Sequence, residues 1–109
     1  MKIKDAAIAA EELDDALTYY RDVHPDFAEA LFNEVSRAKK LIVQFPYAWK
    51  NYGGGLYGFI VRRYPYTIVY RVSDDAIWVL AYAHHKRRQG YWRERLPQRS
   101  SSQGVTFDL

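Results

Sequence analysis

The sequence contains no cysteine, and this absence removes two ways in which a small protein can be held together. No disulfide framework can form, and no thiolate is available as a metal ligand. The stability of the protein therefore does not depend on the redox state of its compartment. This independence fits the cytoplasm, where we expect the protein to act.

Long apolar runs are absent as well. The chain opens with Met1-Lys2-Ile3-Lys4-Asp5 and continues into a stretch rich in Ala, Glu and Asp. A signal peptide needs an uninterrupted apolar segment, and a membrane span needs about 20 apolar residues. We therefore expect neither of these segments, and no membrane partner.

Aromatic side chains are abundant, with 10 Tyr, 5 Phe and 3 Trp among 109 residues, and 49% of the chain is hydrophobic. Such a composition argues against disorder, and the length suits one domain. We expect a single domain over residues 1–96. Pro97 and the run Ser100-Ser101-Ser102 predict a flexible C-terminal tail over residues 97–109.

The net charge of +3 is unevenly distributed along the chain. Residues 1–50 carry 7 Lys and Arg against 9 Asp and Glu, whereas residues 51–109 carry 9 against 4. A basic half suits nucleic acid, the ribosome or an acidic protein partner, and charge alone does not choose among them.

The beginning of the chain has the pattern of an amphipathic helix. From about Ala6 to Val23, apolar residues recur at three- and four-residue spacing with acidic residues between them. Asp5 is placed to cap this helix, because its carboxylate can accept from the first free backbone amides. His24-Pro25 then interrupts the pattern.

A second helix is predicted from about Asp26 to Gln44. Asp26 followed by Glu29 resembles a capping box, and Pro46 follows the last apolar position. Because the connection is short, we expect the two helices to form an antiparallel hairpin. The apolar stripe of the second helix consists of Phe27, Leu31, Val35, Ala38, Ile42 and Phe45.

The second half of the chain has the pattern of a sheet. Asn51 to Gly58 holds four of the six glycines and predicts a flexible loop. Short connections between the β-rich runs indicate an antiparallel meander, to which Met1 to Lys4 could add a short strand. Arg88 to Arg95 predicts a last helical turn or two. The β-rich runs are Tyr57 to Arg63, Tyr66 to Val72 and Ala76 to Ala83.

The predicted fold class is therefore α+β. An N-terminal helical hairpin buries its apolar stripes against one face of a small antiparallel β-sheet.

Three segments of the second half carry a resemblance to a known family. They are Arg62-Arg63-Tyr64-Pro65-Tyr66-Thr67-Ile68-Val69-Tyr70, then Ile77-Trp78-Val79-Leu80-Ala81-Tyr82-Ala83-His84-His85-Lys86-Arg87-Arg88, then Gly90-Tyr91-Trp92-Arg93. In this order and spacing they resemble the C-terminal half of RelE/ParE-type toxins of type II toxin–antitoxin systems. The Phe45-Pro46 ending of the second helix fits the same pattern, so that the resemblance covers roughly residues 5–95.

The resemblance implies a helical hairpin on a small sheet, a cognate antitoxin, and a bacterial or archaeal cytoplasm. It leaves the target open. Members that resemble RelE cleave messenger RNA in the ribosomal A site, whereas members that resemble ParE poison DNA gyrase.

Cleavage of RNA needs a base, an acid and cations that stabilise the charge growing on the phosphate. RelE-like nucleases use cations on the central strands, an arginine after the last long strand and a nearby tyrosine. By this resemblance Arg87 falls near the arginine and Tyr91 near the tyrosine. The central-strand positions fall at about Gly58, Ile60 and Thr67, none of which is cationic. The set of catalytic residues that a RelE-like ribonuclease needs is therefore incomplete.

Other nucleases of the superfamily use a histidine, which makes His84 or His85 a candidate base. The favoured alternative is that one imidazole bonds to neighbouring backbone and the other faces solvent. Adjacent histidines without a well-spaced Asp, Glu or Cys companion make no convincing metal site. We expect neither a metal nor another cofactor.

A second set of residues is a candidate for partner binding, because cations can contact phosphates or an acidic surface of the antitoxin. The alternative for these cations is a solvated face. Arg62 and Arg63 should alternate across a strand, where one of them can pair with the acidic first helix. Trp92 can anchor an interface, although packing at the end of the core is favoured. The set comprises Arg62, Arg63, Lys86, Arg88, Trp92 and Arg93.

Three functions remain open. The first is a ParE-like toxin that traps gyrase and needs no catalytic residues. The second is a ribosome-dependent endoribonuclease that uses Arg87, Tyr91 and His84 on messenger RNA. The third is an inactive binding protein. In each case we expect an acidic antitoxin whose amphipathic segment lies in an apolar groove beside the hairpin and sheet, and a homodimer stays open.

Overall fold

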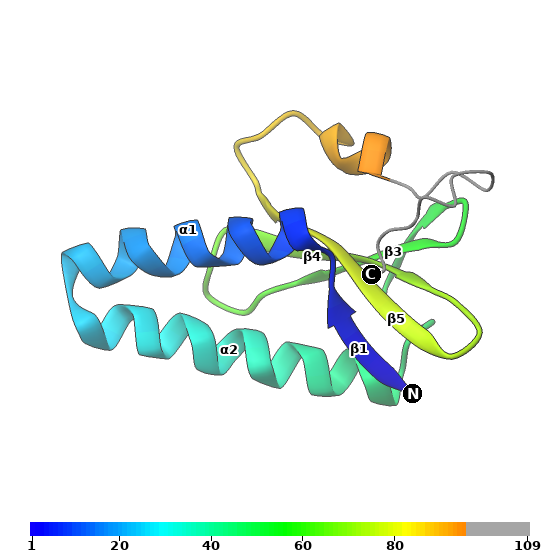
Figure 1. Cartoon of the computed structure of the whole chain (residues 1–109), viewed down its shortest axis with the longest axis horizontal. Coiled ribbons are helices and arrows are strands. Elements are labelled where there is room, and N and C mark those ends of the chain that lie inside the picture. Colours follow the sequence, from blue (N-terminus) through cyan, green and yellow to red (C-terminus); the bar gives the residue numbers. More distant parts are fainter. Residues whose placement is uncertain (96–109) are drawn as a thin grey trace.

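Two long helices lie on one face of a five-stranded sheet in the computed structural model, which describes residues 1–95 (Figure 1). The predicted tail over residues 97–109 lies outside the described residues. In chain order the elements are β1 (Lys2–Asp5), α1 (Ala7–Val23), α2 (Pro25–Gln44), β2 (Lys50–Gly53), β3 (Leu56–Ile60), β4 (Tyr66–Val72), β5 (Ala76–His84) and the 3-10 helix η1 (Tyr91–Arg95).

The strands are ordered β1-β5-β4-β3-β2 across the sheet. Neighbouring strands from β2 to β5 are antiparallel, which confirms the predicted meander. The short N-terminal strand is β1, and it runs parallel to β5, with Lys2 opposite Ala76. The α+β class and the helical hairpin are confirmed.

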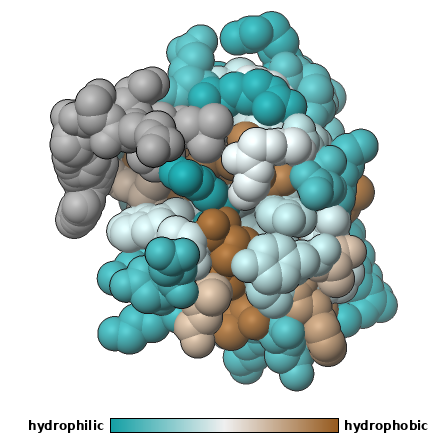
Figure 2. Space-filling view, turned by 90° about the vertical axis from the view of Figure 1, so that its right-hand side faces the viewer, coloured by the Kyte–Doolittle hydropathy of each residue, from teal (hydrophilic) through white to brown (hydrophobic). Residues whose placement is uncertain are grey.

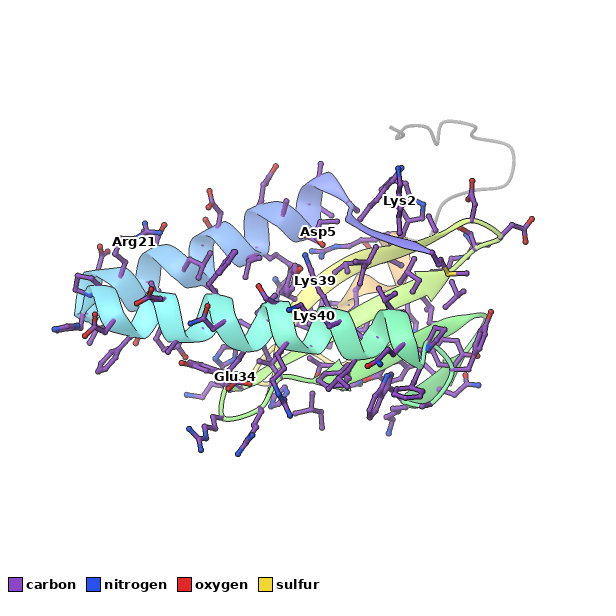
Figure 3. All side chains as sticks on the ribbon, turned by 90° about the horizontal axis from the view of Figure 1, so that it is seen from below. Lys2, Asp5, Arg21, Glu34, Lys39 and Lys40 are labelled. Carbon is purple, nitrogen blue, oxygen red and sulfur yellow. The ribbon has the colours of Figure 1, made fainter. Side chains whose placement is uncertain are left out.

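Helix α1 begins without a side-chain cap, since its N-cap residue is Ala6. The expected cap from Asp5 is wrong, because the carboxylate of Asp5 is engaged elsewhere. It accepts a hydrogen bond from the Tyr82 hydroxyl and lies 3.0 Å from the Lys39 ammonium of α2 (Figure 3). Asp5 thus joins β1, β5 and α2.

Helix α2 begins one residue earlier than predicted, at Pro25. Its cap is His24, whose Nδ1 accepts from the backbone N–H of Asp26 at 3.1 Å. Proline suits the first helical position, because the missing N–H has no intrahelical partner there. The expected capping box of Asp26 and Glu29 is wrong, since Asp26 already lies inside the first turn.

The predicted glycine loop is shorter than expected. Strand β2 overlaps it and forms a hairpin with β3, so that Gly54 and Gly55 connect the two strands. Gly53, Gly54 and Gly55 all have positive φ angles, of 85°, 65° and 81°. Glycine adopts this backbone conformation without the Cβ penalty of other residues, which explains the consecutive glycines.

The sheet buries apolar side chains on both faces. On the helix-covered face, buried residues of α2 pack against Phe59, Ile68, Tyr70, Ile77 and Val79. In α2 the central residues of the predicted stripe are buried, whereas Phe27 and Phe45 at its ends are 50% and 53% exposed. Phe27 is exposed because the hairpin tip projects beyond the sheet (Figure 1).

The second face of the sheet has a smaller cluster that includes Leu56, Val69, Leu80 and Trp92. Helix η1 contributes Trp92 to this cluster. At the far end of the molecule from the hairpin tip, apolar side chains reach the surface between hydrophilic ones (Figure 2). Among residues 1–95, no helix is long and apolar enough to cross a membrane.

Candidate functional site

The carboxylate of Glu12 holds η1 against α1 and β5. Its Oε1 accepts from the backbone N–H of Tyr82 at 3.0 Å and from Nη1 of Arg95 at 2.9 Å. Its Oε2 accepts from the hydroxyl of Tyr91 at 2.8 Å. Arg95 also donates to the carbonyl of Leu80, at 3.1 Å. Because charged hydrogen bonds are among the stronger ones, Glu12 is an effective anchor for the end of the described chain.

Arg87 and Tyr91, the two ribonuclease candidates, lie against each other in this cluster. The Arg87 guanidinium lies 3.7 Å from the ring centroid of Tyr91, and its Nη1 lies 3.6 Å from Oε2 of Glu12. Burial, followed by the hydrogen bond to Glu12, raises the pKa of Tyr91 to about 12. A phenol with this pKa stays protonated near neutral pH and is a poor general base.

His84 and His85 make local contacts at the end of β5. Nδ1 of His84 accepts from the backbone N–H of Lys86 at 3.0 Å, and its ring packs edge-on against Tyr66. Nε2 of His85 lies 3.0 Å from the hydroxyl oxygen of Thr67. The expected backbone contact for one imidazole is confirmed, and the other bonds to a side chain although it is exposed. His84, Arg87 and Tyr91 together line one small hollow.

Four exposed cations that form no ion pair within residues 1–95 lie on two neighbouring loops, and we call these four residues the basic end. Arg62 and Arg63 lie in the turn between β3 and β4, and Lys86 and Arg88 lie in the loop after β5. The expected alternation of Arg62 and Arg63 across a strand is wrong, because β3 ends at Ile60 and both side chains are exposed in the turn. The predicted ion pair with α1 is also not formed: no carboxylate of residues 1–95 lies within 4.0 Å of either guanidinium.

Trp92 and Arg93 have different surroundings although they are adjacent. Trp92 is 2% exposed and packs on Tyr52 with ring centroids 4.9 Å apart. The favoured role of Trp92 in the core is confirmed, and its expected role as a partner contact does not agree with its burial. Arg93 is exposed, with its guanidinium 5.0 Å from the ring centroid of Trp92.

A groove of about 490 Å³ lies at the β2–β3 edge of the sheet. It brings together Gly58, Ile60 and Thr67, the central-strand positions at which RelE-like nucleases carry cations. The ring of Tyr52 covers Gly58 so closely that a Cβ there would lie 2.6 Å from Tyr52 Cε2. The remaining lining residues are Trp49, Lys50, Phe59 and Gln89.

The sequence did not predict the contacts that Glu12 makes with Tyr82 and Arg95. A signal for Glu12 exists, because it lies three residues after Ala9 and four before Ala16, which are both buried. These spacings place all three residues on one helix face. No spacing connects Glu12 with Arg95, since 83 positions separate them.

Within the described part of the chain, no group of three or more His, Asp or Glu side chains is arranged to hold a metal ion.

Comparison with known proteins gives three matches. The family described as "ParE toxin of type II toxin-antitoxin system, parDE" matches residues 5–89. A protein named toxin ParE2, from two strains of Mycobacterium tuberculosis, is 33% identical over 75 residues, which are 68% of this chain and 71% of the relative. A solved structure titled "Chromosomal ParDE TA system from P. aeruginosa" covers 77% of this chain and 95% of that chain, with a TM-score of 0.67 and 20% identity.

Proposed function

The chain belongs to the ParE toxin family of type II toxin–antitoxin systems, and we propose that it stops growth by binding DNA gyrase and not by cutting RNA. One observation carries this proposal: the positions that a ribonuclease would need are uncharged or already engaged. Gly58, Ile60 and Thr67 supply no cation to the groove. A toxin that traps its target needs a binding surface and no reactive side chain.

The surroundings of Arg87 and Tyr91 support the same proposal. Both side chains contact Glu12, and Tyr91 is held in the protonated form by burial and by its hydrogen bond. Their contacts close the second face of the sheet, which is a structural role. His84 is the only one of the three proposed catalytic residues that has no contact with Glu12 among the interactions of residues 1–95.

The first test is induction of the chain without antitoxin in a bacterial host, with incorporation of labelled thymidine and labelled methionine followed in parallel. We expect thymidine incorporation to fall first, because a trapped gyrase blocks replication. An earlier fall in methionine incorporation would instead favour cleavage of messenger RNA on the ribosome.

A test with purified components makes the target explicit. Gyrase, supercoiled plasmid and the purified chain are combined, and linear DNA is measured after protein denaturation. We expect linear DNA to accumulate with the toxin and not with a heat-denatured sample. His84→Ala should leave this accumulation unchanged, because no catalytic base is required; complete loss in a folded His84→Ala variant would contradict the proposal.

We also propose that the cognate antitoxin covers the groove at the β2–β3 edge. Ile60, which lines this groove, is 67% exposed. An apolar segment of the antitoxin would bury Ile60.

This second proposal is tested by replacing one exposed side chain. Ile60→Asp should weaken antitoxin binding at least about tenfold in calorimetry, since it places a charge in an apolar contact. Ile8→Asp is the matched control, because Ile8 is 44% exposed on α1 and does not line the groove. Equal affinity of the two variants would contradict the placement, whereas the gyrase assay reports on the target separately.

A further inference from the structure

The basic end is a group of positive charges that contribute neither to the fold nor to the Glu12 cluster. Arg62, Arg63, Lys86 and Arg88 are exposed, and within residues 1–95 no carboxylate lies within ion-pair distance of any of them. By contrast, Arg87 lies in the same loop but contacts Glu12. The loop therefore holds one arginine that is paired with a carboxylate and two cations, Lys86 and Arg88, that are not paired within residues 1–95.

The two loops of the basic end are fixed to each other by backbone and side-chain contacts. The backbone N–H of His85 donates to the carbonyl of Pro65 at 2.8 Å, and Tyr66 lies opposite His84 in the β4–β5 register. The contact between His85 and Thr67 adds a side-chain link. Both loops leave the sheet at the same end (Figure 1). The two loops that carry the four cations are thus held next to each other.

Arg63 has a backbone conformation that is uncommon for a residue with a Cβ. Its φ angle is 70°, and it is the only positive-φ residue other than glycine among residues 1–95. A left-handed conformation is unfavourable for an L-residue with a Cβ, whereas glycine adopts it freely. Strain of this kind is concentrated at binding sites, where the side chain is needed in one particular place.

The chemistry of the basic end suits phosphate groups better than a protein surface. Three of the four cations are arginines, whose planar fork matches two phosphate oxygens. None of the exposed large apolar residues lies within residues 62–66 or 84–90. Protein interfaces normally need such apolar or aromatic anchors, whereas binding to nucleic acid is dominated by charge on the sugar-phosphate backbone.

We propose that the basic end, formed by Arg62, Arg63, Lys86 and Arg88, binds the sugar-phosphate backbone of nucleic acid. This inference goes beyond the proposed function, because it requires neither gyrase nor antitoxin. Contacts to the backbone position a protein on nucleic acid without reading its sequence. Binding should therefore be insensitive to sequence and strongly dependent on salt.

The test measures binding of the purified chain to three fluorescent probes by anisotropy: a 20-base-pair DNA duplex, a single-stranded DNA and an RNA of the same sequence. For four phosphate contacts on duplex DNA, the slope of log K against log salt should be about −3.6. Affinity should then fall about 150-fold between 50 and 200 mM KCl. The probe that binds most tightly identifies the source of the phosphates.

Two variants with the same change in net charge separate a site from a general effect of charge. In the first, Arg62, Arg63, Lys86 and Arg88 are all replaced with Gln, and the magnitude of the slope should fall by about 1 for each cation. In the second, Lys2, Arg21, Arg37 and Lys40, which are exposed elsewhere on the molecule, are replaced with Gln. The second variant should retain most of the affinity, and circular dichroism should show both to be folded.

A third variant keeps the net charge of the basic end and changes only the shape of its cationic groups: Arg62, Arg63 and Arg88 are replaced with Lys. We expect weaker binding with nearly the same salt slope, because lysine lacks the bidentate fork. Equal losses in the two Gln variants, or no binding of any probe at 50 mM KCl, would overturn the proposal. So would equally tight binding of poly-glutamate with the same number of charges, since that result indicates an acidic protein surface.

Discussion

The phenolic hydroxyl of Tyr82 donates to Asp5 across 77 positions of sequence, with 3.0 Å to each carboxylate oxygen. Lys39 of α2 completes the contact through its ion pair with Asp5. Because Tyr82 is 3% exposed, its hydroxyl has little access to water if the carboxylate is removed. Asp5→Ala should lower the free energy of unfolding by about 2 kcal/mol, measured by urea denaturation. Lys4→Ala, in the same strand but exposed, is the control and should be nearly neutral.

The same contact predicts how stability depends on alkaline pH. Burial, followed by the nearby charge of Asp5, raises the pKa of Tyr82 far above its ordinary value of 10.0. The unfolded chain then loses the Tyr82 proton above pH 10 while the folded chain keeps it, so stability present below pH 10 is lost as pH rises. Tyr82→Phe should reduce this loss by about 1.4 kcal/mol per pH unit. Urea midpoints at pH 9, 10 and 11 measure it; parallel curves for wild type and variant would refute the assignment.

Removal of the Glu12 carboxylate should release η1. Glu12→Gln cannot accept all of the hydrogen bonds from Tyr82, Tyr91 and Arg95, and we expect a loss of about 2–3 kcal/mol in the free energy of unfolding. The rate of backbone hydrogen exchange should increase more within residues 91–95 than in the rest of the described chain. Glu11→Gln removes the same charge one residue earlier, at an exposed position, and should have little effect. If both variants exchange alike, Glu12 is not the anchor.

The cap of α2 provides a small and specific test. His24→Ala removes the acceptor for the backbone N–H of Asp26 and should cost about 1 kcal/mol of stability. His24→Asp should restore most of the loss, because aspartate is a good N-cap. The midpoints of thermal unfolding of the wild type and the two variants measure both effects. Equal stability of the His24→Asp and His24→Ala variants would argue against the capping role.

Because of the backbone strain at Arg63, its replacement with glycine should raise the stability of the protein and weaken its binding to DNA. Arg63→Gly should raise the free energy of unfolding by about 0.5–1 kcal/mol, because glycine accepts the positive φ angle without a Cβ penalty. The same variant should bind the DNA duplex more weakly. Arg62→Gly is the control and should lower stability, since Arg62 has no positive φ angle. Chemical denaturation and anisotropy provide the two readouts.

A substitution at Gly58 tests how closely the groove is packed. A Cβ at this position lies 2.6 Å from the Tyr52 ring, so Gly58→Ala must displace that ring from Trp92. We expect a loss of about 1 kcal/mol in stability. In a Tyr52→Ala background the same substitution should be close to neutral. An unchanged penalty in that background would show that Tyr52 is not the obstacle.

The helices, the three long strands and the fold class could be predicted because each follows from a local period in the sequence. Leu31, Val35, Ala38 and Ile42 recur at helical spacing, and all four are buried in α2. Strand β4 was predicted with its observed bounds, Tyr66–Val72, since a proline precedes it and Ser-Asp-Asp follows it. Local sequence was sufficient for these elements.

Features that depend on distant partners could not be predicted. Asp5 had every local property of a helix cap, but Tyr82 and Lys39 engage its carboxylate. His24 caps α2 because Pro25 fixes where the helix starts, and histidine is an uncommon cap. Strand β2 is short, and its pairing with β3 outweighs the glycine signal of the loop.

In the candidate site, too, local features could be predicted from the sequence, whereas contacts between distant residues could not. Family resemblance made Arg87, Tyr91 and His84 the catalytic candidates, and all three line one hollow. The contacts of Arg87 and Tyr91 with Glu12 could not be predicted, because Glu12 lies 79 positions before Tyr91. Arg62 and Arg63 were predicted as partner contacts, which stays a prediction, and their common exposure follows from the end of β3 at Ile60.

The closure of the sheet by Glu12 also sets an order of events during synthesis. Strand β1 pairs with β5, and Glu12 binds groups 70 to 83 positions later in the chain. The residues of β1 and α1 therefore leave the ribosome well before the residues that they contact. Contacts that close such long loops form late in folding. A nascent toxin of this topology thus stays incomplete until β5 and η1 have been translated, so that a product truncated before them lacks the finished sheet.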